Sequence, residues 1–432
     1  MHRRTFLKSG ALALVTMGLS PSFLRRSAFA EPLTRGAATR GARGGKVLVC
    51  LFQRGAADAL NVVVPFGDRS YYQLRPNIAV PEPGRPNGAV DLDGHFGLHP
   101  ALGALKPLWD RGLLAPIHAV GSPSATRSHF DAQDFMETGT PDVKGTREGW
   151  LNRYLALRGT CEGGCLADAH GHPAQGSPFR GVAMTQQTPR AMEGPAPTVA
   201  MNAIEEFTIR AGGGDAERRL EALYTTGSAD LIHASGSEMF EAMRVLKAAD
   251  PRKYAPENGA EYPKSQFGQR LLQIAQLIKA NVGLEIAFAD VGGWDTHVNQ
   301  GGATGQLANR LGDFGSSVAA FAADLGDRME DVLVLTMSEF GRTARQNGTG
   351  GTDHGHAGSM FAIGGGVQGH RVHGRWPGLA PEQLNEGRDL ALTTDFRAVF
   401  SEVAEKHLGA VRTDRLFPGY TGGPRDWIGV LG

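Results

Sequence analysis

The sequence predicts an α/β protein with a central, mostly parallel sheet and helices on both faces. Short β-branched and apolar runs occur at residues 47–52, 284–291 and 331–337, and such runs suit strands that are buried on both faces of a parallel sheet. Helical patterns lie between them. Polar, glycine-rich loops follow these strands directly, which is where open α/β sheets place their ligand sites.

The first thirty residues have the pattern of an export signal. Arg3 and Arg4 precede an apolar run at residues 11–19 that is too short to span a bilayer, and Ala28-Phe29-Ala30 has the small-x-small form of a cleavage site. We expect a twin-arginine signal peptide at residues 1–30, passage through the twin-arginine translocase to the periplasm or beyond, and no stable membrane span after cleavage. The alternative is an amphipathic helix of the fold.

The charge balance argues against a nucleic-acid partner. Five of the 44 basic side chains lie in residues 1–30, which leaves 39 basic against 44 acidic residues and a net charge of −5. Nucleic-acid-binding domains carry the opposite sign. We expect a flexible lead-in at residues 31–45, one domain at 46–432, and an inserted region at about 150–263.

Three cysteines are too few for a disulfide framework. Cys50 lies in an apolar run and is expected to be a buried thiol. Cys161 and Cys165 could form a disulfide in an oxidising compartment or act as a zinc-binding pair, but no second pair completes a thiolate site.

The first predicted strand, residues 47–52, leads into a loop that contains Asp58. A carboxylate after the first strand of a doubly wound sheet is placed to bind a metal or a ribose, although the sequence Gly-Ala-Ala-Asp lacks a dinucleotide fingerprint. The alternative is an ordinary turn aspartate. A helix is then expected at residues 98–111, and a strand at 113–120. Pro116 favours an edge position or a strand start.

A polar loop leads from that strand to a helix expected at residues 129–137. Ser128 would be the N-cap, where the helix dipole and free amides favour an oxyanion. Arg127 and His129 add positive charge and proton-transfer capacity. The alternative is that Ser128 only caps the helix.

The region between residues 149 and 263 is expected to contain helices at 216–224 and 238–248 but no readable motif. An amphipathic helix follows, with one apolar stripe, and then the strand at 284–291. The stripe consists of Phe267, Leu271, Ile274 and Ile278. A glycine turn after that strand presents Asp295 and His297.

A helix at residues 306–325 joins this strand to the one at 331–337. Because a βαβ crossover puts both strand ends on one edge of the sheet, Asp295 and His297 should lie near Glu339.

Polar side chains follow the strand at residues 331–337. Glu339 and Arg342 come first, and a glycine-rich loop then delivers Asp353, His354 and His356. The alternative is a solvated loop in which these histidines cap backbone groups. A further strand is expected after His356, and Thr394 is predicted to cap a last helix at residues 395–408.

These strand ends supply carboxylate and imidazole groups without thiolate. Such a mixture favours Zn²⁺ or Mn²⁺, with Mg²⁺ or Ca²⁺ as further candidates. The predicted metal ligands are Asp58, Asp295, His297, Glu339, Asp353, His354 and His356.

Several motifs in this order resemble the DUF1501 family of exported proteins, which is grouped with the alkaline-phosphatase-like superfamily. The motifs are RGAADALNVVVP, FGLHPAL, RSHFDAQDFMETGTP, GGWDTHVNQ, SEFGRTARQNGTGGTDHGH and LFPG. The resemblance covers nearly the whole mature chain, which is expected to begin near Glu31. That superfamily includes sulfatases and phosphosugar mutases, and the resemblance implies an alkaline-phosphatase-like fold with a binuclear metal site on the carboxyl edge of the sheet.

The resemblance also implies roles for single residues. Asp58 matches the acid after the first strand, and His354 matches the histidine of the final loop. Glu339-Phe340 stands where the superfamily has an Asp-His pair, which removes one imidazole. His129, and not Ser128, falls at the phosphatase nucleophile position, and the sulfatase Cys-x-Pro-Ser-Arg signature is absent.

Two functions are compatible with these observations. The first is an exported metal-dependent hydrolase or transferase that acts on a phosphate or sulfate ester of a small molecule or polymer. Its catalytic residues would be Ser128, His129, Arg127 and Arg342. The second is a non-catalytic binding or scaffold protein that retains the fold, because fold alone does not fix function.

Overall fold

The computed structural model describes residues 45–159, 177, 179–204, 254–410 and 412–432. It confirms an α/β fold with a mostly parallel, mixed sheet of eight strands, in the order β11-β5-β10-β9-β1-β8-β6-β7. The signal peptide, the lead-in, Cys161 and Cys165, and the helices expected at 216–224 and 238–248 lie outside the described residues. Within the described ranges, no helix is long and apolar enough to cross a membrane.

The chain divides into two compact units, and all side chains discussed below as a candidate site belong to the larger one. The larger unit contains residues 46–146, 256–272 and 288–432. The smaller one includes residues 147–255 and 273–287, with the described elements α7 (Trp150–Gly159), β6 (Gly181–Ala183), η2 (Arg190–Met192) and β7 (Val199–Ala200), of which β6 and β7 pair in parallel. The insertion expected at about 150–263 stays a prediction.

The centre of the sheet is built from the apolar runs of the sequence. Strand β1 (Val47–Arg54) pairs in parallel with β9 (Val332–Met337), and every residue of these two strands except Arg54 is buried. Strand β8 (Ile286–Gly292) follows β1 in the sheet order. These three strand predictions are confirmed. Because β1 lies between β8 and β9, the crossover that contains α11 passes over one strand.

Strand β10 (Gly358–Gly364) runs antiparallel to both of its neighbours, β9 and β5 (Leu114–Gly121). On its other side β5 pairs with the two-residue strand β11 (Thr394–Asp395), and a parallel bridge joins Ile117 to His373. Pro116 therefore lies next to the short edge of the sheet, where a missing N–H is tolerated.

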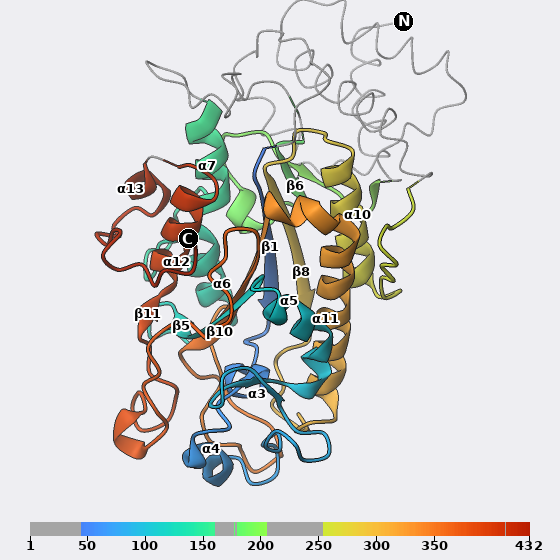
Figure 1. Cartoon of the computed structure of the whole chain (residues 1–432). Helices are drawn as coiled ribbons and strands as arrows, with labels where there is room; N and C mark the ends of the chain where they lie inside the picture. Colours follow the sequence, from blue (N-terminus) through green and yellow to red (C-terminus); the bar gives the residue numbers. More distant parts are fainter. Residues whose placement is uncertain (1–44, 160–176, 178, 205–253, 411) are drawn as a thin grey trace, which may run out of the picture. The chain divides into compact units, whose positions relative to one another are not determined.

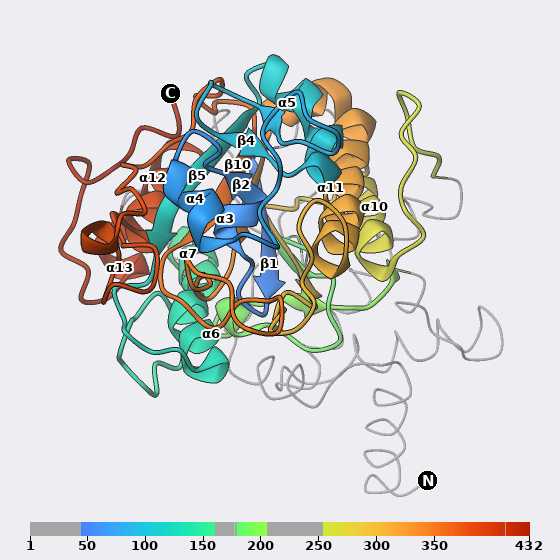
Figure 2. The same cartoon turned by 90° about the horizontal axis from the view of Figure 1, so that it is seen from below.

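The helices of the larger unit cover both sides of its strands. Helix α11 (Gln306–Leu325) packs on η1 (Pro100–Leu105), and α11 and α12 (Phe396–Lys406) lie on opposite sides of the strands in both views (Figures 1 and 2). Further helices of the described chain are α6 (His129–Thr138), α10 (Gln266–Lys279), η5 (Gly326–Glu330), η6 (Pro381–Gln383) and α13 (Thr413–Leu416).

Two local predictions need correction. The helix expected at residues 98–111 is divided into η1 and α5 (Lys106–Asp110). Pro107 explains the division, since its ring removes an N–H and clashes with the preceding turn. The N-cap of α12 is Asp395, whose side chain accepts from the Arg397 N–H, so the prediction of Thr394 was one residue wrong.

A small subsidiary layer lies at the end of the sheet to which β1 points (Figure 1). It contains α3 (Ala59–Val62) and α4 (Arg69–Leu74), together with a three-stranded sheet of β2 (Val63–Val64), β4 (Gly97–Leu98) and β3 (Val90–Asp91). Its chain covers the carboxyl edge next to the loops that carry the predicted site residues.

Candidate metal centre

Glu339 lies just after β9, and its side chain is fully buried. Three donors converge on its Oε1 atom: His129 Nδ1 at 2.7 Å, Gln133 Nε2 at 2.8 Å and the Gly55 N–H at 2.9 Å. Burial raises the pKa of this carboxyl group, but the hydrogen bonds from His129 and Gln133 outweigh burial and the net pKa is lowered. Glu339 is therefore an ionised acceptor whose Oε1 is fully used.

His129 is the first residue of α6, directly after the N-cap Ser128. Its hydrogen bond to Glu339 raises its pKa. Because Nδ1 faces Glu339, Nε2 faces the other way, 3.0 Å from His354 Nε2 and 3.5 Å from Asp295 Oδ2. The buried Phe340 ring packs beside His129 and His354, with centroid distances of 4.9 and 5.1 Å. Phe340 thus supports the two rings.

His354 is held by the backbone of its loop. An antiparallel bridge joins it to Arg342, and a Cβ atom on Gly355 would lie only 2.4 Å from the Arg342 carbonyl. His354 Nδ1 donates to the Arg127 carbonyl at 2.9 Å, and burial lowers the pKa of the ring. Since a carbonyl only accepts, neutral His354 carries its proton on Nδ1 and a lone pair on Nε2.

Asp295 and His297 follow β8, as expected. His297 Nε2 lies 3.0 Å from both His354 Nε2 and Asp295 Oδ1, and His297 Nδ1 faces Asp353 Oδ1 at 3.1 Å. Arg342 Nη1 donates to Asp295 Oδ1 at 2.5 Å. Burial raises the pKa of Asp295, but the contact with Arg342 outweighs it and the net pKa is lowered.

His129, Asp295 and His354 form a group that could hold a metal ion, because their ligand atoms all lie within 4.8 Å of one another. Both histidines direct Nε2 at the group and donate Nδ1–H to an oxygen, which is the orientation that metal-binding histidines usually have. Among the described residues this is the single group of its kind, whereas the family resemblance implies two metal positions.

The net charge around the group favours the binding of a divalent cation. Three carboxylates, Asp295, Glu339 and Asp353, contact the histidines, and one guanidinium, Arg342, contacts Asp295. With neutral histidines these four groups carry a net charge of −2. A divalent ion would bring the sum to zero.

The structure brings together most of the predicted metal ligands, in different roles. Asp295 and His354 belong to the group, and His297 lies beside it. Glu339 and Asp353 hold the Nδ1 atoms of His129 and His297. The imidazole of His129, predicted as catalytic, takes a place in the group itself.

Two predicted ligands, Asp58 and His356, contact neither the group nor the residues that hold it in place. Both carboxylate oxygens of Asp58 are bound by Arg75, at 2.6 and 2.9 Å, and Gln300 Nε2 donates to Asp58 at 2.6 Å. His356 Nε2 donates to the Ser122 carbonyl at 3.0 Å. Asp58 and His356 thus bind other parts of the protein and do not face the Nε2 atoms of His129 and His354.

The remaining predicted catalytic residues have partners of their own. Ser128 is exposed, and its hydroxyl accepts from the Asp131 N–H at 3.5 Å. Arg127 pairs with Asp389 at 2.7 Å and Glu386 at 2.8 Å. Arg342 is buried and also donates to Thr352. Neither guanidinium points freely at solvent.

Sequence reasoning missed three supporting residues. Gln133 was detectable, because it lies four residues after His129 and therefore on the same face of α6. Arg75 and Gln300 carried no local signal. Gln300 connects Asp58 to Thr352, which in turn contacts Arg342, so a buried chain of hydrogen bonds runs from Asp58 to Asp295.

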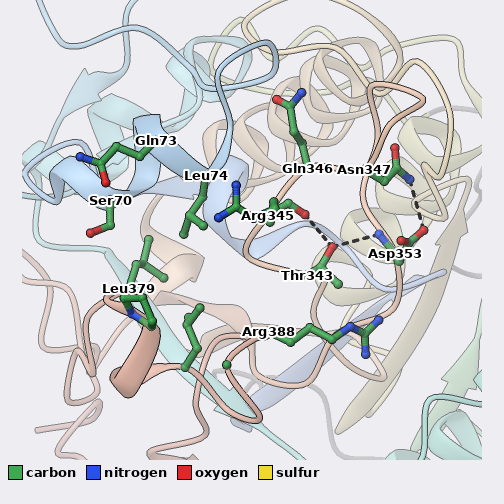
Figure 3. Close-up of a pocket in the computed structure, with 13 residues that line it drawn as sticks. Ser70, Gln73, Leu74, Thr343, Arg345, Gln346, Asn347, Asp353, Leu379 and Arg388 are labelled. Carbon is green, nitrogen blue, oxygen red and sulfur yellow. Dashed lines mark hydrogen bonds between the residues drawn. The ribbon is translucent and has the colours of Figure 1, made fainter.

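A cavity of about 430 Å³ lies beside Asp353, with α4 and the loops around residues 343–353 and 379–388 as its walls (Figure 3). Its charged side chains are Arg345, Arg388 and Asp353. His129, His297 and His354 contact one another and are called the histidine cluster below. Asp353 lines the cavity and also contacts His297, so it lies between the cavity and the histidine cluster.

Comparison with known proteins gives a family and no activity. No curated protein matches the chain. A protein in the alkaline phosphatase superfamily from Vibrio parahaemolyticus is similar in structure, at 13% identity and a TM-score of 0.31, over 86% of this chain and 71% of that one. The PH0037 protein from Pyrococcus horikoshii is similar at 12% identity and a TM-score of 0.28, over 76% and 88%. A family model described as "Protein of unknown function (DUF1501)" matches residues 115–417, and the chain belongs to that family.

Proposed function

We propose that the chain is a metal-dependent hydrolase or transferase of phosphate or sulfate esters, with Zn²⁺ bound by His129, Asp295 and His354. One observation carries the proposal. The Nε2 atoms of His129 and His354 face each other at 3.0 Å while both Nδ1 atoms are directed at oxygen acceptors. Two lone pairs at this distance repel unless a cation or a proton lies between them.

The donor set supports zinc and an open site. Two imidazoles and one carboxylate are ligands of catalytic zinc sites, which keep a fourth position for water or substrate. Mn²⁺ has overlapping preferences and is the second candidate. The exposed fractions of the His129 and His354 side chains are 25% each, and that of Asp295 is 43%, so solvent and substrate can reach the group.

A bound zinc ion would polarise an ester oxygen and lower the pKa of a water molecule. The side chains of the protein would hold the ion and orient the groups around it. Glu339 fixes His129, Arg342 fixes Asp295, and Asp353 fixes His297 with Nε2 turned toward the group. His297 is then placed to accept a proton from the attacking water, as a histidine held by a carboxylate does in hydrolases. We assign the nucleophile to water because the Ser128 hydroxyl caps α6.

A panel of aryl phosphate, phosphodiester and sulfate esters, each with Zn²⁺, Mn²⁺ and Mg²⁺, tests the proposal. Wild-type protein should hydrolyse at least one ester, and His129→Ala and His354→Ala should lose both the ion and the turnover. His370→Asn is the matched control, because His370 is an exposed histidine outside the group. Turnover that survives both alanine variants would refute the site.

The alternative is a metal-binding scaffold without turnover. The ion pairs of Arg127 and Arg342 favour it, because both guanidiniums are already neutralised by protein carboxylates and so stabilise a transferred anion less. A wild-type protein that binds about one ion per chain yet hydrolyses no ester with any metal would support this alternative.

We also propose that the protein is exported by the twin-arginine translocase, which would place the ester substrate in the periplasm or outside the cell. The support is the sequence pattern of residues 1–30. Cell fractionation of wild type and of a variant with Arg3→Lys and Arg4→Lys tests it. Export of the doubly substituted chain at the wild-type level would contradict this route.

A further inference from the structure

The cavity beside the histidine cluster has the chemistry of a substrate subsite. We propose that it binds the non-reacting part of the ester substrate, and that this part is rich in hydroxyl groups and carries a second anionic group held by Arg345. This inference rests on the proposed ester chemistry at the metal group. It names the class of substrate: a compact polyhydroxylated molecule with two acidic groups.

Two side chains that line the cavity, Asp353 and Arg388, also contact His297 and His354. Asp353 Oδ1 faces both His297 Nδ1, at 3.1 Å, and Asn347 Nδ2, at 3.2 Å. Arg388 lines the cavity and donates to the His354 carbonyl at 2.9 Å. A molecule whose ester group lies at the metal group would therefore extend along Asp353 and Arg388 into the cavity.

Arg345 is the cavity's unneutralised cation. Arg388 lies 3.7 Å from Asp389, whereas the exposed Arg345 guanidinium has neither an ion pair nor a hydrogen bond with any part of the chain that the structure describes. In Figure 3, Arg345 lies beside Leu74, whereas the guanidinium of Arg388 lies on the side of Asp353. The free charge thus lies on the Leu74 side of the cavity, apart from Asp353, and a second anionic group of the ligand would bind there.

The remaining walls fit a hydroxylated ligand. Ser70, Gln73 and Gln346 offer hydroxyl and amide groups that both donate and accept, while Leu379 and Leu384 supply an apolar surface for carbon atoms. The volume of about 430 Å³ is within the range of small-molecule sites. An apolar ligand would leave these polar groups without partners.

Three sugar phosphates test whether a second anionic group on the ligand strengthens binding. Glucose 6-phosphate has one acidic group, 6-phosphogluconate adds a carboxylate, and fructose 1,6-bisphosphate adds a phosphate. Calorimetry on the full mature chain, loaded with Zn²⁺, should show that at least one of the two doubly acidic probes binds roughly tenfold or more tightly than glucose 6-phosphate. Which of them does so tells whether the second group is a carboxylate or a phosphate. Equal affinity for all three would overturn the inference.

The variant Arg345→Gln should remove this advantage and leave the affinity for glucose 6-phosphate unchanged. Arg85→Gln is the matched control, since Arg85 is another exposed arginine that does not line the cavity. Both side chains are exposed, so thermal unfolding and zinc content should equal those of wild type. An advantage that persists in Arg345→Gln would refute the role of Arg345, even in an active enzyme.

The same binding measurement in His354→Ala distinguishes the two proposals. Arg345-dependent binding of the doubly acidic probes to this variant, together with an inactive wild type, would mean that the cavity inference holds and the ester chemistry fails. Ester turnover by wild type with no dependence on Arg345 would mean the reverse.

Discussion

His129 Nδ1 faces Glu339 Oε1 across 2.7 Å, and this hydrogen bond decides which nitrogen of His129 faces the metal group. A buried carboxylate accepts only, so the proton stays on Nδ1. Gln133 and the Gly55 N–H hold the same oxygen in place. Glu339 thus acts on the group through His129, although it does not belong to the group itself.

Replacing Glu339 by glutamine should weaken zinc binding by about 10- to 100-fold, the usual cost of losing an outer carboxylate. The amide is uncharged, so it makes His129 a weaker ligand. Competition with a chromogenic chelator measures the affinity. Glu382→Gln, at an exposed site, is the control and should match wild type. Equal affinities for both variants would show that Glu339 does not support the group.

His297→Ala should keep the ion and lose turnover, because we assign His297 to proton transfer and not to the metal. Zinc content by mass spectrometry and ester hydrolysis are measured on the same sample. Loss of the ion together with activity would instead make His297 a fourth protein ligand, and the proposed open position would then be wrong.

Gly355→Ala should weaken zinc binding without unfolding the protein. The added Cβ atom would lie 2.4 Å from the carbonyl group of Arg342, so the loop that carries His354 must shift away from it. Gly348→Ala is the control in the same loop, where a Cβ atom meets nothing within 4 Å. Chelator competition should separate the two variants. If their affinities are equal, the loop adapts and the position of His354 does not depend on this contact.

Arg75→Met should lower the free energy of unfolding by about 3–5 kcal/mol, because it leaves the buried Asp58 carboxylate without its partner. Urea unfolding in the presence of a chelator measures this cost. Asp58→Asn should retain zinc affinity close to that of wild type. A stoichiometric loss of zinc in Asp58→Asn would restore Asp58 as a ligand.

His118 should make stability fall on acidification. Burial lowers its pKa to about 4, from 6.5 in the unfolded chain. Its Nδ1 accepts from the Ala119 N–H and its Nε2 faces the Val63 carbonyl, so the folded protein holds the ring neutral. Because the folded pKa is the lower one, the contribution of His118 is complete above about pH 6.5 and is lost as the pH falls toward 4.

The loss should amount to roughly 3 kcal/mol, by 1.36 kcal/mol per pKa unit. Urea unfolding of wild type and His118→Gln between pH 7 and pH 4 measures it. The difference in unfolding free energy between the two should shrink in this window. A constant difference would mean that His118 takes up no proton on unfolding.

The strands could be predicted because their information is local. Residues 47–52 and 332–337 are apolar without alternation, and a helix of the predicted length, α11, leads into the second run. The antiparallel direction of β10 has no such signal. It depends on the path of the loop that carries Arg342 and His354, and several loop paths suit the same apolar pattern.

The site was predictable as a set of residues but not as a set of roles. Strand ends meet at one edge of a sheet, so Asp295, His354 and Glu339 could be grouped from spacing alone. Spacing does not tell which atom of a side chain faces inward. Glu339 binds the far nitrogen of His129, and Asp58 meets Arg75, because side-chain contacts between distant segments decide these roles.

Asp353 lines the cavity and also forms a hydrogen bond with His297. Because one side chain takes part in both, binding in the cavity and binding of the ion should be thermodynamically linked. A ligand in the cavity that attracts Asp353 changes how firmly His297 is held, and the ion beside His297 changes what Asp353 offers the ligand. By linkage, any factor by which the ligand alters zinc affinity must equal the factor by which zinc alters ligand affinity. Occupancy of the cavity and of the metal group would then be cooperative even before any bond is broken.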